Sequence, residues 1–561
     1  MANTLSLGSG NWGAKESLLL GYYEDGTQFL PETFDVTRAT GGTRVNKDGL
    51  IETPAEIGSE LVVNGNFATD SDWTLGSGWN ISGGSLIASS ASSNSFQTSS
   101  FVLGKIYKAT YSISDYVSGT FRIQVGSGGI GNTNSSNGTF VEYIEYSGSN
   151  FLYLKGSSSF NGSIDNVSVK EYNNKNLARI DYLDDAKGAL LTEPQSTNLV
   201  TYSEDFSDSS WEKTNSTIVA NSTISPDGTL NADKVVETSA ISYTRVRQSF
   251  SFISGNSYSF SVFYKANGRN FIQLEFNTSA FPTSSLGVFD VGTGTVNNVG
   301  TGLDSASIKD FGNGWYRCTA TATSDVTTNA LVAMYVSETA SVSYQGNGVS
   351  GGFIWGAQLE GENALGYNGE YATSYIPTDG STVTRNQDEV NNGGDVNSFG
   401  SEGVLYFEAA YLTDSGLYRK ISINDGTNDN QITIESRPAL NQVKAFVTVG
   451  GVSSFSSVHT LTDITGFNKM ALKWKENDFS FFANGVNVQS NSSGVTPASG
   501  TLTELSFGIG SGSRFFGKTK NIQAFNTALS DSDLLSLTTT GSVPYWTQYS
   551  AMATSLNYTN K

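Results

Sequence analysis

The chain has 561 residues, a net charge of −20 and only 15% charged residues, against ~25% in an average soluble domain. Aromatic residues make up 12% of the chain, so it has enough apolar surface to fold. The 32 basic residues are outnumbered by 52 acidic ones and form no cluster, which argues against nucleic acid as a partner.

Single cysteine and histidine residues narrow the chemistry further. With only Cys318 and His459, the chain can form no intrachain disulfide, iron–sulfur cluster or His-rich metal site. The longest apolar runs, such as Leu18–Leu20, are far too short to span a bilayer, so no membrane insertion is expected. Residues Met1–Thr4 lack the charge and apolar pattern of a secretory signal, which predicts a soluble protein made in a cytoplasm.

Alternation of large and small polar residues runs through most of the chain. Tyr107–Ser114 and Tyr258–Tyr264 place large side chains on one face, as in a half-buried antiparallel strand. Asp-Gly, Asn-Gly and Gly-Ser turns separate such runs, and the best helical segment is the short Ser530–Leu537, with capping residues at its start. The predicted fold is all-β, with tandem sandwiches.

An internal repeat divides the first two thirds of the chain. Three landmarks occur twice in the same order: a Phe followed by a Trp, a Phe-to-Tyr segment, and a closing strand. The first copy has Phe67 and Trp73, Phe101–Tyr107 and Ile164–Val169, and the second has Phe206 and Trp211, Phe252–Tyr258 and Ile354–Leu359. This repeat predicts two related domains, at residues 59–172 and 198–391.

The repeat also resembles the jelly-roll carbohydrate-binding modules of glycanases and viral adhesins. The likeness is carried by the opening Asn64-Gly65-Asn66-Phe67 with Trp73, and by the closing Ile164-Asp165-Asn166-Val167. It implies a β-sandwich in which the opening Phe and Trp lie in the core.

Five sequence blocks, in a fixed order, resemble a family of bacteriophage structural proteins. They are Phe34–Thr40 with Val45–Glu52, Leu190–Leu199 with Tyr202–Phe206, Asn313–Cys318, Ala372–Thr378, and Thr382–Arg385. The first jelly roll is then an insertion between the first and second blocks. The resemblance implies an N-terminal virion-docking or oligomerisation segment at residues 1–58 and a connector at residues 173–197. We expect the N-terminal segment, too short for a core of its own, to order against a partner, and its removal to leave soluble sandwiches.

The last third is similar to a laminin-G/concanavalin-like lectin sandwich, placed at residues 392–540 and followed by a tail at 541–561. Val404–Ala409, Asn468–Trp474 and the closing Phe516–Ser530 carry this likeness. Asn484-Gly485 is typical of a two-residue type I′ hairpin turn.

Residues that could perform chemistry are few. His459 has no recognisable nucleophile or orienting acid, and Cys318, in an alternating run, is expected to be a buried thiol. Glycosidases need two carboxylates across a cleft, and the candidates by residue type are Glu193, Glu204, Asp205 and Asp184-Asp185. No separation can be measured from a sequence, so no catalytic or cofactor-binding residue is assigned and the chain is not expected to be an enzyme.

Calcium is the one cofactor that the sequence leaves open. The segment Asn424–Asn430 concentrates hard oxygen ligands, with Asp425, Asn428 and Asp429 as the candidate ligands. It lacks the spacing of an EF-hand, and Asn, Asp and Gly also favour tight turns for conformational reasons. A solvated hairpin is the favoured interpretation.

Sugar binding would use aromatic rings flanked by amide and hydroxyl groups. Trp315, Trp355 and Trp474 fall at strand positions typical of core, whereas Tyr153 and Tyr411 cannot be assigned to core or surface from the pattern. The ligand-binding residues therefore stay unassigned.

Together these patterns favour a bacteriophage virion protein, a head-fibre or tail-fibre subunit on the particle exterior. Its expected partners are other virion proteins of the capsid or tail, further copies in a homotrimer or other homo-oligomer, and host surface glycans used for attachment. Two alternatives are a capsid decoration or head-fibre protein without a ligand, and a glycanase acting on host surface polysaccharide. A bacterial cell-surface adhesin is a third, weakened by the missing signal sequence.

Overall fold

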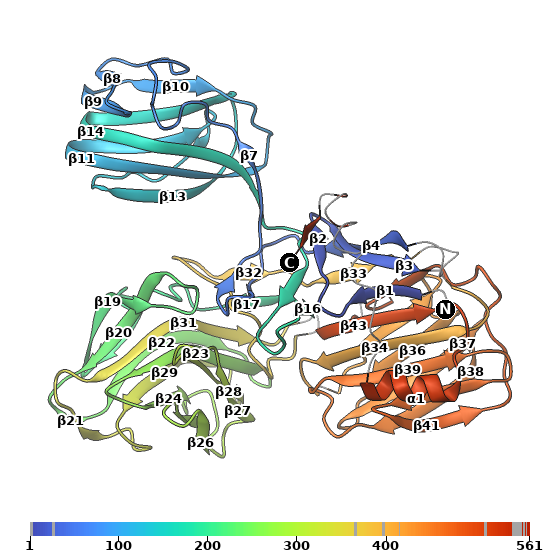
Figure 1. The fold of residues 1–561 in the computed structure, drawn as a ribbon. Coiled ribbons are helices and arrows are strands. Elements are labelled where there is room, and N and C mark those ends of the chain that lie inside the picture. The colour runs from blue at the N-terminus through green and yellow to red at the C-terminus, as the bar shows by residue number, and fades with distance from the viewer. Residues whose placement is uncertain are drawn as a thin grey trace. The chain divides into compact units, whose positions relative to one another are not determined.

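The computed structural model describes residues 4–24, 29–363, 367–394, 399–414, 416–509, 513–540, 553, 556 and 558–560. The chain folds as two compact units (Figure 1). One comprises residues 55–174, here called the inserted module, and the other comprises residues 1–54 together with 175–561. The all-β prediction is confirmed, because strands dominate and one α-helix is found in the described ranges. That helix is too short to cross a membrane.

The inserted module is a sandwich built on two long strands that run side by side (Figure 1). β11 and β14 pair along most of their lengths, with irregularities between Ser114 and Thr120 where both strands bend. Each therefore contributes to both layers. The strands are β7 (Glu56–Glu60), β8 (Trp79–Ser82), β9 (Ser85–Ala91), β10 (Asn94–Thr98), β11 (Ile106–Val125), β12 (Gly129–Ile130), β13 (Gly138–Glu145) and β14 (Phe151–Asn173).

The module has its own hydrophobic core. Phe67 is 1% exposed and Trp73 9%, and the two rings pack with their centroids 5.5 Å apart. Alternate residues of the long strands, such as Ile123 and Leu154, are fully buried beside them. The opening Phe and Trp therefore lie in the core, as the resemblance to carbohydrate-binding modules implied.

The central sandwich, defined here as residues 198–391, stacks two six-stranded sheets in the order β18-β22-β29-β24-β25-β26 and β19-β20-β31-β23-β28-β27. The strands of these sheets are β18 (Glu212–Thr214), β19 (Ser216–Ile224), β20 (Leu230–Glu237), β22 (Thr244–Phe252), β23 (Ser257–Asn267), β24 (Phe271–Phe276), β25 (Leu286–Asp290), β26 (Thr295–Val299), β27 (Ser305–Asp310), β28 (Tyr316–Thr323), β29 (Thr328–Ser337) and β31 (Gly351–Gly361). Two short pairs lie beside them, β17 (Ser196–Asn198) with β32 (Val383–Arg385) and β21 (Ile241–Ser242) with β30 (Tyr344–Gln345), whereas β33 (Glu389–Asn391) pairs with an N-terminal strand.

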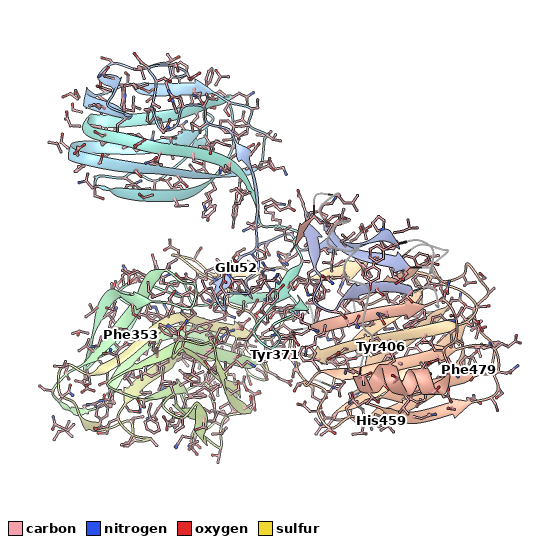
Figure 2. The ribbon with its side chains drawn as sticks, viewed as in Figure 1. Glu52, Phe353, Tyr371, Tyr406, His459 and Phe479 are labelled. Carbon is pink, nitrogen blue, oxygen red and sulfur yellow. The ribbon has the colours of Figure 1, made fainter. Side chains whose placement is uncertain are left out.

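The C-terminal sandwich, residues 392–540, packs a five-stranded sheet against a larger sheet through one apolar core. Tyr406 lies under the helix with Leu534 and Leu537, whereas Phe479 belongs to the core between the sheets (Figure 2). The elements are β34 (Gly403–Tyr411), β35 (Lys420–Asn424), β36 (Gln431–Ser436), β37 (Gln442–Val449), β38 (Val452–Thr460), β39 (Asn468–Trp474), β40 (Phe479–Ala483), β41 (Val486–Asn491), β42 (Glu504–Ser506), β43 (Gly517–Phe525) and α1 (Asp531–Thr540).

The N-terminal strands extend that larger sheet. β1 pairs with β43 in the register Leu5↔Ala524, and Trp12 and Leu19 join the same core at 1% and 0% exposure. The connector joins too, with Leu190 opposite Thr519. The added strands are β1 (Thr4–Gly8), β2 (Gly13–Lys15), β3 (Leu18–Glu24), β4 (Phe29–Thr37), β15 (Arg179–Asp181), β16 (Ala189–Thr192) and β44 (Thr559–Asn560), whereas β5 (Arg44–Val45) and β6 (Ile51–Glu52) form a separate two-stranded sheet.

This pairing corrects one expectation. The N-terminal segment orders against the C-terminal sandwich of its own chain, so removing residues 1–58 would strip strands from a continuous sheet instead of leaving intact sandwiches. Its docking role is a separate matter and stays a prediction. Most of the predicted tail, 541–561, lies outside the described residues.

Several local predictions are confirmed. Asn484 and Gly485 form the two-residue hairpin between β40 and β41, with φ of 47° and 77°, because both residues tolerate positive φ. Ser530 Oγ accepts a hydrogen bond from the Asp533 backbone N–H at 3.2 Å and caps α1. Trp315, Trp355 and Trp474 are at most 2% exposed, in the core.

Candidate functional site

Three of the five sequence blocks contribute Arg38, Glu193 and Arg385 to a buried cluster of charges, here called the junction cluster, which Arg179 and Asp388 complete. Arg38 Nη1 lies 2.7 Å from Asp388 Oδ1, and Arg179 Nη1 lies 2.6 Å from Glu193 Oε2. Arg385 Nη1 lies 2.5 Å from the same Glu193 oxygen, and Arg179 Nη2 pairs with Asp388 Oδ2. Each of these five residues is at most 4% exposed.

Glu193 and Asp388 are held ionised by these arginines. Burial alone would raise the pKa of Glu193, but the charges of Arg385 and Arg179 hold it below its ordinary value. For Asp388 the opposing charges of Arg179 and Arg38 likewise outweigh burial and lower the pKa. Because both carboxylates are committed to ion pairs, Glu193 is a structural residue here and not a free acid or base.

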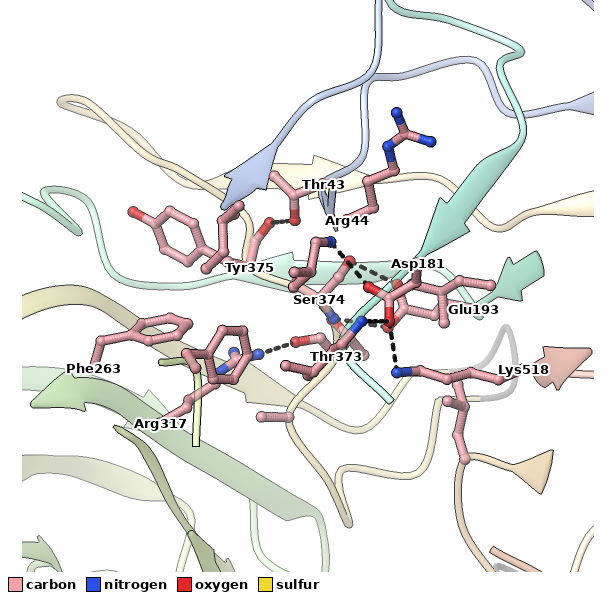
Figure 3. A pocket seen from close by; sticks show the side chains of 17 residues that line it. Thr43, Arg44, Asp181, Glu193, Phe263, Arg317, Thr373, Ser374, Tyr375 and Lys518 are labelled. Atoms are coloured by element: carbon pink, nitrogen blue, oxygen red, sulfur yellow. Dashed lines mark hydrogen bonds and ion pairs between the residues drawn. The ribbon is translucent and has the colours of Figure 1, made fainter. Parts of the chain in front are cut away.

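A small pocket borders the junction cluster (Figure 3). It holds about 140 Å³, well below the ~300 Å³ at which small-molecule pockets begin. Two of its cations are paired within the chain: Lys518 Nζ lies 2.8 Å from Asp181 Oδ1, and Arg44 Nη2 lies 2.7 Å from Glu52 Oε1. A third, Arg317, donates from Nη1 to the Thr373 carbonyl at 2.6 Å. The blocks therefore specify how the segments of this unit join.

The other acidic candidates do not pair across a cleft. Asp184 pairs with Lys309 and Lys518, and Asp185 Oδ2 lies 2.7 Å from Lys520 Nζ. Glu204 Oε1 accepts a hydrogen bond from the Tyr375 hydroxyl at 2.9 Å, and burial raises the pKa of Glu204. Asp205 Oδ1 accepts the backbone N–H of Ser207 at 2.9 Å, which makes it a turn residue.

The calcium candidates lie in the turn between β35 and β36. Asp425 Oδ1 accepts the backbone N–H of Thr427 at 2.9 Å, and its Oδ2 accepts the Asn430 amide at 2.8 Å. The Asn428 Oδ1 accepts Lys420 Nζ at 3.3 Å, and the Asp429 backbone N–H is bound by Thr427 Oγ1. Among the described residues no group of His, Cys, Asp and Glu is arranged to hold a metal. Calcium binding stays a prediction, and the turn explains the composition without it.

His459 and Cys318 occupy ordinary strand positions. His459 lies on β38 opposite Val443, and partial burial lowers its pKa (Figure 2). Cys318 is fully buried on β28, as predicted, and burial raises the pKa of its thiol well above the usual value. A protonated, inaccessible thiol is unreactive.

The outer face of one sheet of the inserted module carries aromatic and cationic side chains. Leu152 and Leu154 of β14 point into the core at 1% and 0% exposure, so Phe151, Tyr153 and Lys155, which alternate with them, lie on the outer face. The register places Tyr153 between Phe96 of β10 and Gln124 of β11. Lys155 lies between Asn94 and Arg122 in the next row.

The three rings of this face form one half-buried cluster. Phe96 packs edge-on against Phe151 with their centroids 5.3 Å apart. Tyr153 lies 6.0 Å from Phe96 and 5.8 Å from Phe151, between ring centroids. We name this surface the aromatic face, comprising Phe96, Arg122, Phe151, Tyr153 and Lys155; Gln124, also in this register, is buried.

Aromatic rings beside cationic groups suit a ligand with apolar faces and polar edges, such as a sugar. The sequence pattern raised Tyr153 without placing it; the structure puts Tyr153 on this surface and Tyr411 in the core at 3% exposure. Sequence reasoning missed Phe96, Phe151 and the two cations. The available signal was the run Phe151-Leu152-Tyr153-Leu154, where large residues occupy both faces of one strand.

Comparisons with known proteins do not assign this chain to a family. No protein-family model matches the chain, and no curated protein sequence matches it. Among solved structures, the carbohydrate-binding module CBM40 of the Ruminococcus gnavus IT-sialidase, bound to α2,3-sialyllactose, is 18% identical, covering 25% of this chain and 84% of that one, with a TM-score of 0.22. At that TM-score the similarity bears on neither the ligand nor the function of this chain.

Proposed function

We propose that the chain is a bacteriophage virion subunit, part of a head or tail fibre on the particle exterior, that binds host surface glycans through the inserted module. The aromatic face carries the binding half of this proposal: three adjoining, half-buried rings lie on the outer face of a sheet beside two cations. The order of the five sequence blocks supports the virion half. Adhesion would then depend on several weak sites engaging together in a homotrimer or other oligomer.

Replacing Tyr153 tests the binding role. We expect Tyr153→Ala in the full-length chain to weaken glycan binding by about tenfold or more, since a central aromatic contact contributes more than ~1 kcal/mol. Binding is measured on a glycan array and then by calorimetry with the strongest ligand.

Tyr143→Ala provides the matched control. Tyr143 lies on β13 in the other layer of the same module and is 56% exposed, so its loss removes an exposed ring away from the aromatic face. Equal losses for the two variants, or no glycan bound by a folded wild-type chain, would contradict the proposed role and favour a decoration protein without a ligand.

Particle location needs its own measurement. Mass spectrometry of purified virions is expected to detect the chain, and sedimentation of the pure protein is expected to show an oligomer. Release of reducing ends from host polysaccharide by the pure protein would instead favour the glycanase alternative.

A further inference from the structure

The cations of the aromatic face are arranged in a way that a neutral ligand does not explain. Lys155 of β14 lies directly opposite Arg122 of β11. Like charges directly opposite each other on one sheet face repel and destabilise the pair. Burial, and then the charge of Arg122, lowers the pKa of Lys155.

A second like-charged pair in the same module provides the contrast. Lys108 lies opposite Lys170 on the same two strands, in the other layer. There a carboxylate is nearby, since Lys170 Nζ lies 3.9 Å from Glu60 Oε2. Among the described residues, no ion pair includes Arg122 or Lys155, although the chain carries 52 acidic residues and a net charge of −20.

Lys155 is also tied to the aromatic cluster. Its Nζ lies 5.2 Å from the centroid of the Tyr153 ring. A ligand that reaches this ring would therefore meet Lys155, and Arg122 lies directly opposite Lys155. We propose that the aromatic face selects anionic carbohydrates, whose carboxylate, sulfate or phosphate group is bound between Arg122 and Lys155. This rests on the proposed glycan-binding function.

The anion would replace the missing counter-charge. A guanidinium donates two parallel hydrogen bonds to a planar carboxylate or to a sulfate or phosphate edge, and the ammonium adds a third donor. The aromatic rings would supply affinity for the sugar ring, and the cations would supply the preference for charge. The two contributions can be separated by substitution.

The test uses the full-length chain and an array on which each acidic glycan, with a carboxylate, sulfate or phosphate, stands beside its neutral parent. We expect acidic members to bind about tenfold more tightly than their parents, with a preference that shrinks as salt rises. Comparing the acid types shows which anion fits. In the double variant Arg122→Gln, Lys155→Gln, the preference should disappear while residual binding of the neutral parents persists.

The matched control is Lys108→Gln, Lys170→Gln, which removes the same net charge from the same module and should leave the preference intact. Equal binding of acidic and neutral members, or loss of preference in the control variant as well, would overturn this inference and leave glycan binding standing. A folded chain that binds no member of the array overturns both.

Discussion

The inserted module and the central sandwich share the order of four neighbouring strands. The outer face of these strands differs between the two, because its aromatic rings are half-buried in the inserted module and covered by other side chains in the central sandwich. In the first, β10, β14, β11 and β12 are neighbours in that order, and in the second β22, β29, β24 and β25 are. A tyrosine opposite a glutamine occupies the outer face of both: Tyr153 with Gln124, and Tyr335 with Gln273.

The central sandwich closes this face with its own side chains. The Tyr335 hydroxyl donates to Glu275 Oε2 at 2.5 Å, and the Arg245 guanidinium lies 5.8 Å from the Tyr335 ring and 4.7 Å from that of Tyr243. Tyr335 is left 7% exposed. The comparison teaches that a shared strand order does not imply a shared ligand, because the neighbouring rows decide whether the ring is available.

The largest expected difference between the two modules concerns stability. The central sandwich is anchored in the junction cluster, whereas the inserted module has a separate core and contributes no residue to that cluster. Arg179→Met removes one of the two arginine partners of both Glu193 and Asp388, and should destabilise the larger unit by about 3–5 kcal/mol.

Calorimetry is expected to show one thermal transition lowered and that of the inserted module unchanged. Arg247→Met, which breaks an exposed pair with Glu212, serves as the control and should cost only about 0–1 kcal/mol. A parallel fall of both transitions in Arg179→Met would mean that the two units are thermodynamically coupled and would break the comparison.

Lowering the pH should lower the thermal transition of the larger unit more than that of the inserted module. The pKa values of Glu193 and Asp388 are lower in the folded chain than their ordinary values of 4.5 and 3.8. The unfolded state therefore takes up protons first, so these ion pairs contribute full stability above about pH 4.5 and lose it progressively as the pH falls further.

Calorimetry between neutral pH and about pH 3.5 should show the transition of the larger unit falling, and Glu193→Gln should flatten part of that fall. An unchanged pH slope in Glu193→Gln would show that other carboxylates control acid unfolding.

A smaller effect distinguishes the two equivalent tyrosines. Tyr335→Phe removes the hydrogen bond to Glu275 and should cost about 0.5–1.5 kcal/mol without changing glycan binding. Tyr153→Phe keeps the ring and loses only a weak 3.4 Å contact with Ser149 Oγ, so its stability should be unchanged. Thermal melts measure the stability of both variants, and calorimetric titration measures their glycan affinity. A loss of glycan affinity in Tyr335→Phe would mean that the outer face of the central sandwich also binds the ligand.

Strand-level features could be predicted from the sequence because they depend on neighbouring residues. Alternation identified the strands, and Asn484-Gly485 identified a hairpin. The buried position of Trp315, Trp355 and Trp474 followed from the same alternation.

Long-range pairing could not be predicted in this way. The pairing of β1 with β43 joins residues more than five hundred positions apart, and nothing in Thr4–Gly8 names its partner strand. The aromatic face has the same origin, since Phe96, Tyr153 and Arg122 become neighbours only through the register of three strands. The blocks that hold Arg38, Glu193 and Arg385 were recognisable, but the pairing of these residues with Arg179 and Asp388 required the fold.

The ends of the inserted module have a consequence for how it can be lost. β7 and the end of β14 pair with each other, with Ile57 opposite Tyr172, so the chain enters and leaves the module side by side. The module is therefore attached through two covalent connections, unlike a domain at a chain terminus. A protease that cuts either connection leaves the folded module attached through the other, and shedding it requires two cuts in the same molecule. A domain held in this way survives a first proteolytic event.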